Sequence, residues 1–364
     1  MGFEEFIGNE ATVRQLREML GRGRFPHALI LTGPRGAGKY KLAMMMARAM
    51  NCQNQPRDEE GLPEFCGHCP ACEQIAEGDD LEARFHEAVE AREALKESEK
   101  KETSIMVQTH PDVLVIPPDP PQLLVKVGQV RHLISTVYYQ PQAGHRKVYI
   151  FPEANFMKEA ANSLLKILEE PPEFATLFLL AENATQLLPT IRSRCITLRL
   201  APLEAEAMEQ ALQRRVDLTA VQRQLVARLS GGAVGRALGF DLGEYIAARK
   251  DALAILRTSV EGGGHDELFR VTEGYRAGAE GRVRTEHLLD VLYSLLQDVT
   301  YLSCGTPELV RNTDLQAELS AMAGARSFEW LADAVRRVDE VRQGMRRNLL
   351  RSLSLDALAV SLEH

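Results

Sequence analysis

The stretch ALILTGPRGAGKYKL, residues 28–42, decides the fold of this 364-residue chain. Its first five residues form an apolar run that is typical of a buried strand, and a helical pattern begins at Lys39. Between them, GPRGAGK has the G-x-x-x-x-G-K spacing of a phosphate-binding loop, in the strand-to-helix setting that this motif requires. Its glycines let backbone N–H groups turn toward a phosphate, and its lysine adds a positive charge. The candidate nucleotide-binding residues here are Gly33, Gly36, Gly38 and Lys39.

Outward from this stretch, the N-terminal half of the chain alternates short apolar runs with helical patterns. Such alternation predicts an α/β domain in which helices flank a parallel sheet, here of five strands. The expected strands are Ala28–Thr32, Asp112–Ile116, Lys147–Phe151, Thr176–Leu180 and Ile196–Leu200. The expected helices include Asn9–Gly21, Lys39–Met50, Val127–Tyr138 and Met157–Glu170.

Beyond Pro202 the strand signal ends, and the sequence shows helical patterns interrupted by glycines such as Gly231-Gly232. A length of 364 residues favours two or three domains. We therefore expect a nucleotide-binding-type domain over 1–202, a small helical lid over 203–242 and an all-α domain over 243–364.

Two positions near the phosphate loop lack the usual ligands for Mg²⁺. The residue after Lys39 should be Ser or Thr, whose short hydroxyl reaches the metal, but the chain has Tyr40. The strand over 147–151 should lead into an Asp, with a Glu beside it to orient the attacking water, but it leads into Pro152 and Glu153. These two losses argue against Mg²⁺ and against ATP hydrolysis at the chain's own site. Two alternatives stay open: the loop still binds ATP or ADP, or it is kept only as a turn.

Four of the six cysteines lie close together in the sequence: Cys52, Cys66, Cys69 and Cys72. Four soft thiolates suit tetrahedral Zn²⁺, and a site filled by four protein ligands leaves no open position for catalysis. The spacing therefore predicts a structural zinc site in a small module over 51–77, whose folding the metal would support. The alternatives are free thiols, a redox switch, or a site in which His68 replaces one cysteine.

The chain carries a net charge of −8, so as a whole it is repelled by nucleic acid and by anionic membranes. Half of this excess lies in residues 79–104, which contain nine acidic and five basic side chains in a helical pattern. This stretch is either a solvated helical insertion or a partner-binding helix. No apolar run approaches the roughly 18 residues of a membrane span, and the acidic start, MGFEEF, is unlike a signal peptide. We expect a cytoplasmic protein that contacts DNA only locally.

Four further motifs carry a family resemblance. They are FPHAL at 25–29, NSLLKILEEPP at 162–172, LPTIRSRC at 188–195 and, near the end, NLL at 348–350 before LSL at 353–355. They resemble motifs of the clamp-loader subunits of bacterial DNA polymerase III, in the AAA+ group of ATPases. The likeness is dense over about 1–240, outside the charged insertion, and thin over 243–347. Tyr40 and Pro152 match the delta-prime branch, whose own ATP site is commonly degraded, rather than the ATP-hydrolysing gamma/tau branch.

The resemblance implies roles for two arginines. Arg194, in Ser-Arg-Cys, is the expected arginine finger, which acts in trans on the ATP of a neighbouring subunit; such fingers are worth about 10³–10⁵ in rate. The alternative for Arg194 is an ordinary ion pair at a helix end. Arg236 opens a helix in the expected lid, where related proteins place an arginine over the nucleotide, and a surface or capping role is its alternative. Asn183 is a weaker candidate for sensing the γ-phosphate.

The resemblance also implies partners. These are gamma/tau and delta subunits in a hetero-pentamer, the sliding clamp, and primed DNA reached through the assembly, with no membrane involved. The region 243–364 would join its counterparts in a collar that holds the pentamer together. Two other interpretations are a gamma/tau-type ATPase motor with an unusual metal site, and a zinc-containing P-loop interaction protein outside replication.

Overall fold

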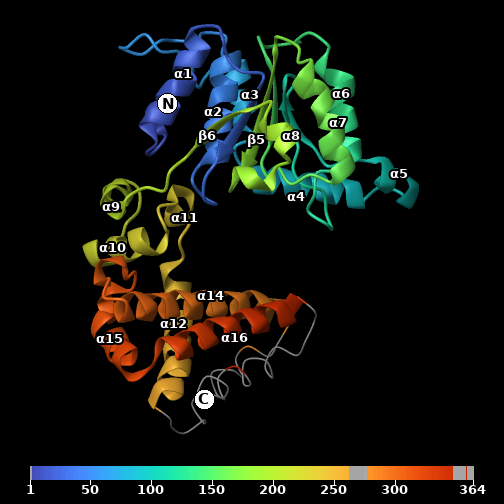
Figure 1. Ribbon diagram of the computed structural model, residues 1–364. Helices are drawn as coiled ribbons and strands as arrows, with labels where there is room; N and C mark the ends of the chain where they lie inside the picture. Colours follow the sequence, from blue (N-terminus) through green and yellow to red (C-terminus); the bar gives the residue numbers. More distant parts are fainter. Residues whose placement is uncertain (1, 262–274, 276–277, 347–357, 359–364) are drawn as a thin grey trace. The chain divides into compact units, whose positions relative to one another are not determined.

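The computed structural model describes residues 2–261, 275, 278–346 and 358 (Figure 1). The chain divides into two compact units. Unit 1 comprises Met1–Ala211 and Gly231–Arg236, and unit 2 comprises Leu212–Ser230 and Ala237–His364. Residues of the expected lid, 203–242, are thus found in both units, and the three-part division remains a prediction.

A six-stranded sheet forms the centre of unit 1. Its strands are β1 (Ala28–Thr32), β2 (Val107–His110), β3 (Val113–Val115), β4 (Lys147–Phe151), β5 (Ala175–Ala181) and β6 (Ile196–Arg199). They lie in the order β2-β3-β4-β5-β1-β6, and every neighbouring pair is parallel except β2 with β3. In the centre, Ile30 of β1 lies between Leu179 of β5 and Thr197 of β6. The carboxyl ends of the five parallel strands therefore share one edge of the sheet, where ligands of such folds bind.

All five strands expected from the sequence are present, but the prediction of a wholly parallel five-stranded sheet was wrong at one edge. Strand β2 adds a sixth strand, which pairs Val107 with Val115 and His110 with Val113 in antiparallel fashion. It has only four residues, VQTH, and Pro111 follows it directly. An alternation this short does not stand out in a sequence.

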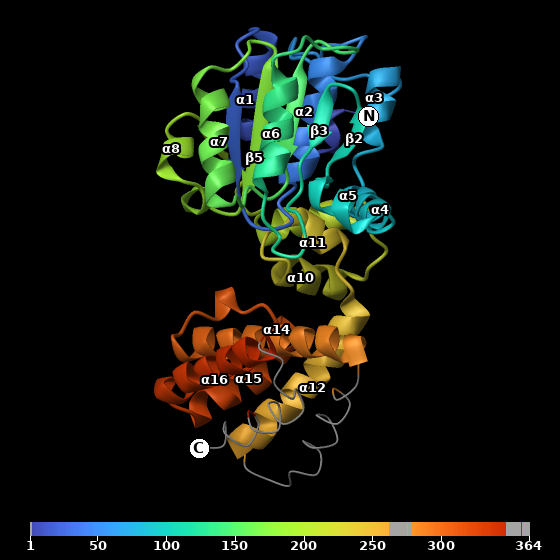
Figure 2. The same ribbon diagram turned by 90° about the vertical axis from the view of Figure 1, so that its right-hand side faces the viewer.

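Helices cover both faces of the sheet, as Figures 1 and 2 show. One face carries α1 (Glu10–Gly21), α2 (Lys39–Asn51) and α3 (Pro70–Ala76), and the other carries α6 (Val127–Val137), α7 (Lys158–Glu169) and α8 (Pro189–Arg192). Alternate residues of β1 enter the two cores: Leu29 and Leu31 the first, Ala28 and Ile30 the second. Because both faces are buried, β1 is a continuous apolar run rather than an alternating one.

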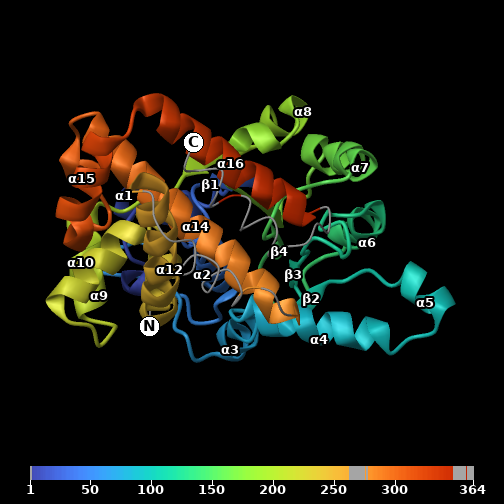
Figure 3. The ribbon, with the colours of Figure 1, turned by 90° about the horizontal axis from the view of Figure 1, so that it is seen from below.

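The charged insertion forms two short helices, α4 (Leu81–Glu93) and α5 (Glu97–Glu102), and α4 packs beside β2 (Figure 3). Arg92 of α4 donates from Nη1 to Oδ1 of Asp119 at 2.7 Å, and Lys126 donates to the same oxygen at 2.9 Å. Asp119 is only 2% exposed. The insertion is therefore anchored to unit 1 by a nearly buried ion pair, and not only by its two ends.

The described residues of unit 2 form helices joined by turns and loops, and none of them lies in a strand. Its main helices are α10 (Ala220–Leu229), α12 (Leu242–Glu261), α14 (Gly278–Ser303), α15 (Gln316–Ala325) and α16 (Phe328–Arg346). Helix α14 packs against α12, α15 and α16. A buried polar network joins these helices: Asp298 accepts from the backbone and side chain of Asn312, whose side-chain oxygen accepts from Arg249 and Tyr245. The NLL and LSL motifs, 348–350 and 353–355, lie outside the described residues.

No helix in the described part of the chain is both long enough and apolar enough to cross a membrane.

Candidate functional site

The phosphate loop lies where the sequence predicted, between the end of β1 and the start of α2. Gly33 has a φ of +150°, and a Cβ added there would lie 2.5 Å from the carbonyl oxygen of Leu200. Gly36 has a φ of +82°, and a Cβ there would lie 3.0 Å from the backbone nitrogen of Arg236. Both positions therefore need glycine, for backbone conformation and for space.

Lys39 turns back onto its own loop. Its Nζ donates to the carbonyl oxygens of Gly33 at 2.6 Å and Pro34 at 2.8 Å. Burial lowers the pKa of Lys39, and the carboxylates of Glu182 and Glu153 offset part of this shift. The charge expected for a phosphate thus already has partners within the chain.

Tyr40 also finds a partner away from the phosphate loop. Its hydroxyl donates to the carbonyl oxygen of Gly78 at 2.6 Å, just beyond α3. Burial, with a smaller contribution from the charge of Asp79, raises the pKa of Tyr40, so the phenol stays protonated. The residue that should hold Mg²⁺ instead links α2 to residues 51–79, which we call the cysteine-rich segment.

Of the remaining residues considered for the nucleotide site, the structure brings only the backbone around Arg236 into contact with the phosphate loop. Glu153 is exposed after β4, and Asn183 uses its side-chain oxygen to accept from the amide of Thr185 at 3.0 Å. The backbone N–H of Gly235, in α11 (Val234–Leu238), donates to the Gly36 carbonyl at 2.8 Å. The structure thus brings the backbone of Arg236 beside the loop, while the Arg236 side chain is exposed.

Arg194 lies in the turn between α8 and β6. Its Nη2 contacts Oε1 of Glu169 at 2.6 Å, and its Nη1 donates to the carbonyl oxygen of Thr190 at 2.9 Å and to Oγ of Ser193 at 3.3 Å. The Arg194 side chain remains 34% exposed, and that of Glu169 is 53% exposed. The sequence analysis gave a helix-end ion pair as the alternative role of Arg194, and such a pair is present; its partner Glu169, at the end of α7, could not be named from the sequence because it lies 25 positions away.

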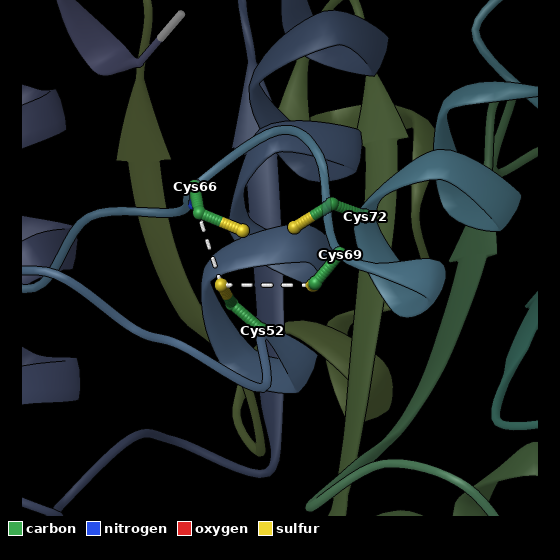
Figure 4. Close-up of side chains that lie close together, drawn as sticks. All are labelled: Cys52, Cys66, Cys69 and Cys72. Atoms are coloured by element: carbon green, nitrogen blue, oxygen red, sulfur yellow. Dashed lines mark hydrogen bonds between the residues drawn. The ribbon is translucent and has the colours of Figure 1, made fainter.

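The four cysteines converge, as Figure 4 shows. The sulfur atoms of Cys52, Cys66, Cys69 and Cys72 all lie within 4.8 Å of one another, and those of Cys52 and Cys69 are 4.0 Å apart. A tetrahedral metal with bonds of about 2.3 Å to sulfur needs sulfur atoms roughly 3.8 Å apart. The donor set and its spacing therefore fit a closed, four-thiolate metal site.

Local structure explains how these cysteines meet. Cys52 ends α2, Cys69 begins α3, and Cys72 lies within α3. Cys66 closes the set, and its backbone N–H donates to the sulfur of Cys52 at 3.3 Å. His68 is exposed, with its Nδ1 2.8 Å from the carbonyl oxygen of Cys66.

The thiol pKa values shift in different directions within the cluster. Burial raises the pKa values of Cys52 and Cys72. Burial acts in the same direction on Cys69, but hydrogen bonds from the backbone of Cys72 and Gln53 outweigh it and lower the pKa of Cys69 to about 6. Thiolate character is therefore most easily reached at Cys69.

Arg48, which the sequence analysis did not single out, fastens this segment to α2. Arg48, in the middle of α2, forms an ion pair with Asp79, and its guanidinium lies over the ring of Phe65 at 5.6 Å. The signal that could have revealed it is a lone arginine in the otherwise apolar run MMMARAM, residues 44–50. The contacts of α2 with the cysteine-rich segment thus include those of Tyr40, Arg48 and Ala49, the last of which accepts from the side chain of Gln55 at 2.6 Å.

Comparisons with known proteins agree with this arrangement. The family described as "DNA polymerase III, delta subunit" matches residues 8–101 and 82–204, which together exceed half of the chain. The tau subunit of DNA polymerase III from Escherichia coli (strain K12) is 28% identical over 333 residues, which cover 91% of this chain and 41% of that one. The delta-prime subunit from Pseudomonas aeruginosa is 33% identical over 216 residues, covering 58% of this chain and 55% of its own. The chain thus spans about half or less of these relatives.

Two other comparisons cover nearly the whole length of both this chain and the similar protein. The delta-prime subunit of Bacillus subtilis (strain 168) is 24% identical over 338 residues, covering 93% of this chain and 91% of that subunit. A solved structure, a DNA polymerase III gamma subunit-related protein from Thermotoga maritima, shares the fold with a TM-score of 0.50 at 16% identity, covering 96% of this chain and 98% of its own. The chain therefore belongs to the DNA polymerase III delta subunit family, as a clamp-loader subunit of the delta-prime type.

Proposed function

We propose that this chain works in the replicative clamp loader as a subunit that does not hydrolyse ATP itself but completes the ATP site of a neighbour. The contact that carries this proposal is the one between Tyr40 and Gly78. Because of this contact, the side chain at the position that should bind Mg²⁺ supports the fold instead, although the backbone of the phosphate loop is intact. Pro152, where an Asp should follow β4, removes the second metal ligand. The chain would help place a ring-shaped sliding clamp on primed DNA.

Arg194 is the residue that we propose for the neighbour's site. It is partly exposed, and its partner Glu169 is exposed as well. An exposed ion pair contributes about 0–1 kcal/mol, so Arg194 can exchange Glu169 for a phosphate at little cost. A guanidinium placed against the transferring phosphoryl group stabilises the charge of the transition state.

The complex assembled with its own gamma/tau and delta subunits tests this role. Arg194→Ala should leave folding and assembly unchanged, because a half-exposed arginine outside the core costs little to remove. The clamp- and DNA-stimulated ATPase should fall by the share of the one site that Arg194 completes, and clamp loading should fall further because the sites act together. Arg192→Ala is the matched control and should have less effect. An Arg194→Ala complex that loads clamps at the normal rate would show that the arginine is only structural.

We also propose that the four-cysteine cluster binds Zn²⁺ as a structural ion. When bound, the metal would cross-link the end of α2 to α3. Cys52, Cys66, Cys69 and Cys72 would hold it, with no position left for a substrate.

The partners follow from the same proposal. We infer a hetero-pentamer with gamma/tau and delta subunits in the cytoplasm, in which the helices of 243–364 contribute to a collar. The net charge of −8 makes contact with the sliding clamp and primed DNA a property of the assembly rather than of this chain alone. ATP or ADP, if bound at the chain's own loop, would contact Gly33, Gly36, Gly38, Lys39 and Arg236.

A gamma/tau-type ATPase is the second candidate, favoured by the intact glycine backbone of the loop and by the likeness to tau. Magnesium-dependent hydrolysis by the purified chain, lost in Lys39→Ala, would support it. The third interpretation, an interaction protein outside replication, is opposed by the match to the DNA polymerase III family.

A further inference from the structure

We infer that unit 1 has a second binding site, for a small organic anion that carries a carboxylate or phosphate on a flat ring. The site is a cavity of about 320 Å³ between α6 and the beginnings of β3 and β4. This volume lies at the lower end of the range for small-molecule sites. Its wall includes Asp112, His132, Tyr139, Gln142, Lys147 and Tyr149.

The cavity is separate from the phosphate loop. Lys147 is the first residue of β4 and Asp112 directly precedes β3, so both mark the amino ends of parallel strands. The phosphate loop follows the carboxyl end of β1, and Glu153 follows the carboxyl end of β4. The two sites therefore lie at opposite edges of the same sheet.

Lys147 supplies the positive charge. The residue is only 6% exposed, and its Nζ donates to the carbonyl oxygen of Thr136 at 2.7 Å and lies 5.9 Å from the centre of the Tyr139 ring. Neither partner carries a full negative charge. An ammonium group has three donors, so two remain for a ligand. A largely buried cation with spare donors favours an anion.

Asp112, the carboxylate in the same wall, is occupied elsewhere. Its two oxygens accept from the backbone amides of Gln142, Ala143 and Gly144 at 2.8, 2.8 and 2.7 Å. Burial by itself would raise the pKa of Asp112, but these three bonds outweigh it and keep the pKa below its ordinary value. The ionised carboxylate therefore stabilises the loop before β4, and it forms neither a hydrogen bond nor an ion pair with Lys147, so the other donors of Lys147 remain for a ligand.

The rest of the wall fits an aromatic anion. The hydroxyl of Tyr149 lies 3.5 Å from Oγ1 of Thr136, and burial raises the pKa of Tyr149, so the phenol is a neutral hydrogen-bonding group in the wall. Tyr139 is 68% exposed, so its ring is accessible for stacking. A ligand could thus place its acidic group at Lys147 and its ring against Tyr139.

Saturation-transfer NMR on the full chain, with benzoate and phenyl phosphate as probes, tests the site. Benzyl alcohol is the neutral control and should bind much more weakly than either anion. Lys147→Met should weaken anion binding about tenfold or more, since it removes a charged hydrogen bond. Lys158→Met is the matched control, because Lys158 is an exposed lysine of α7, and it should leave binding unchanged. Lys39→Ala serves only to locate the probe: anion binding that is lost in this variant would lie at the phosphate loop and would count against the proposal.

Binding of benzoate alone would identify the ligand as a carboxylate, and binding of phenyl phosphate alone as a phosphate ester. Should Lys147→Met fail to fold, Tyr139→Ala carries the test, with binding expected to weaken about two- to fivefold through loss of stacking. The proposal fails if neither anion binds at millimolar concentration, if benzyl alcohol binds as well as benzoate, or if a folded Lys147→Met or Tyr139→Ala chain binds as the unchanged protein does.

Discussion

A candidate binding site lies at each end of α2, and the two sites differ in which of their expected ligands are present. At the amino end, the phosphate loop retains its backbone, with glycines at 33, 36 and 38, but the side chains that would hold Mg²⁺ are gone. At the carboxyl end, the cysteine cluster retains all four donors within 4.8 Å. The fold needs the backbone of the loop, because the loop joins β1 to α2. The side chains that would bind Mg²⁺ are needed only for hydrolysis, so their replacement leaves the fold intact. With zinc bound as proposed, each cysteine would be both a metal ligand and part of a cross-link, so losing one would damage the fold itself.

The comparison also explains where Tyr40 belongs. Its hydroxyl donates to the carbonyl oxygen of Gly78, and Arg48 and Ala49 of α2 also contact this part of the chain, through Asp79 and Gln55. The tyrosine that replaces a magnesium ligand at the amino end of α2 thus helps to hold the cysteine-rich segment in place. Substitutions at the cysteines should therefore have the largest effect on stability. Substitutions at the loop should have smaller effects on stability and little effect on ATP hydrolysis by the chain itself.

The largest effect is expected from removing the metal. Cys69→Ser should lose the roughly one zinc ion per chain that metal analysis of chelator-free protein would detect. Metal binding of order 10–16 kcal/mol supports folding of such small modules, so residues 51–77 should become sensitive to protease and the melting temperature should fall sharply. Cys304→Ser, an exposed cysteine outside the cluster, is the control and should keep the metal. Zinc retained at full occupancy in Cys69→Ser would refute the assignment.

The next effect concerns the loop backbone. Gly33→Ala should destabilise unit 1 by about 3 kcal/mol, because the added Cβ would meet the Leu200 carbonyl in a strained conformation. Gly23→Ala also has a positive φ, +65°, but nothing within 4 Å of its Cβ, and should cost about 1 kcal/mol. Denaturant unfolding measures both. Equal losses would show that the close approach at Gly33 contributes nothing.

A smaller effect is expected at Tyr40. Tyr40→Phe should cost about 1 kcal/mol in the free energy of unfolding, because the buried Gly78 carbonyl loses its donor. Tyr138→Phe, at an exposed tyrosine, should change stability little. A Tyr40→Phe chain as stable as the unchanged protein would mean that the hydroxyl does not support the link to the cysteine-rich segment.

The smallest effect is expected at Lys39. The purified chain should show negligible ATPase activity, because Tyr40 and Pro152 replace both ligands to Mg²⁺, and Lys39→Ala should leave that baseline unchanged. Tyr40→Ser should not restore hydrolysis, since Pro152 still removes the second ligand. A turnover rate close to that of the gamma/tau subunit, abolished in Lys39→Ala, would overturn this view of the loop.

Much of unit 1 could be predicted from local patterns. The boundaries of β1 and β4 match the expected ones because both strands are continuous apolar runs bounded by clear breaks. The cysteine cluster was predictable because its ligands are close in sequence, three of them within seven residues. The edge strand β2 was not, because four residues of mixed polarity carry too little signal. The arginine-finger role of Arg194 stays a prediction, since it concerns a neighbour's site.

By itself the sequence determined the α/β class of unit 1, the phosphate loop, the loss of its magnesium ligands and the set of cysteines, because each depends on residues that are neighbours in the chain. Only the tertiary structure decided what the displaced side chains do. Lys39 bonds to its own loop, Tyr40 reaches Gly78, and Arg194 reaches Glu169. Lys147 and Asp112 line a cavity at the opposite edge of the sheet. Except for the local contact of Lys39, these contacts join residues far apart in sequence, so their distances and burial exist only once the sheet and its helices have packed.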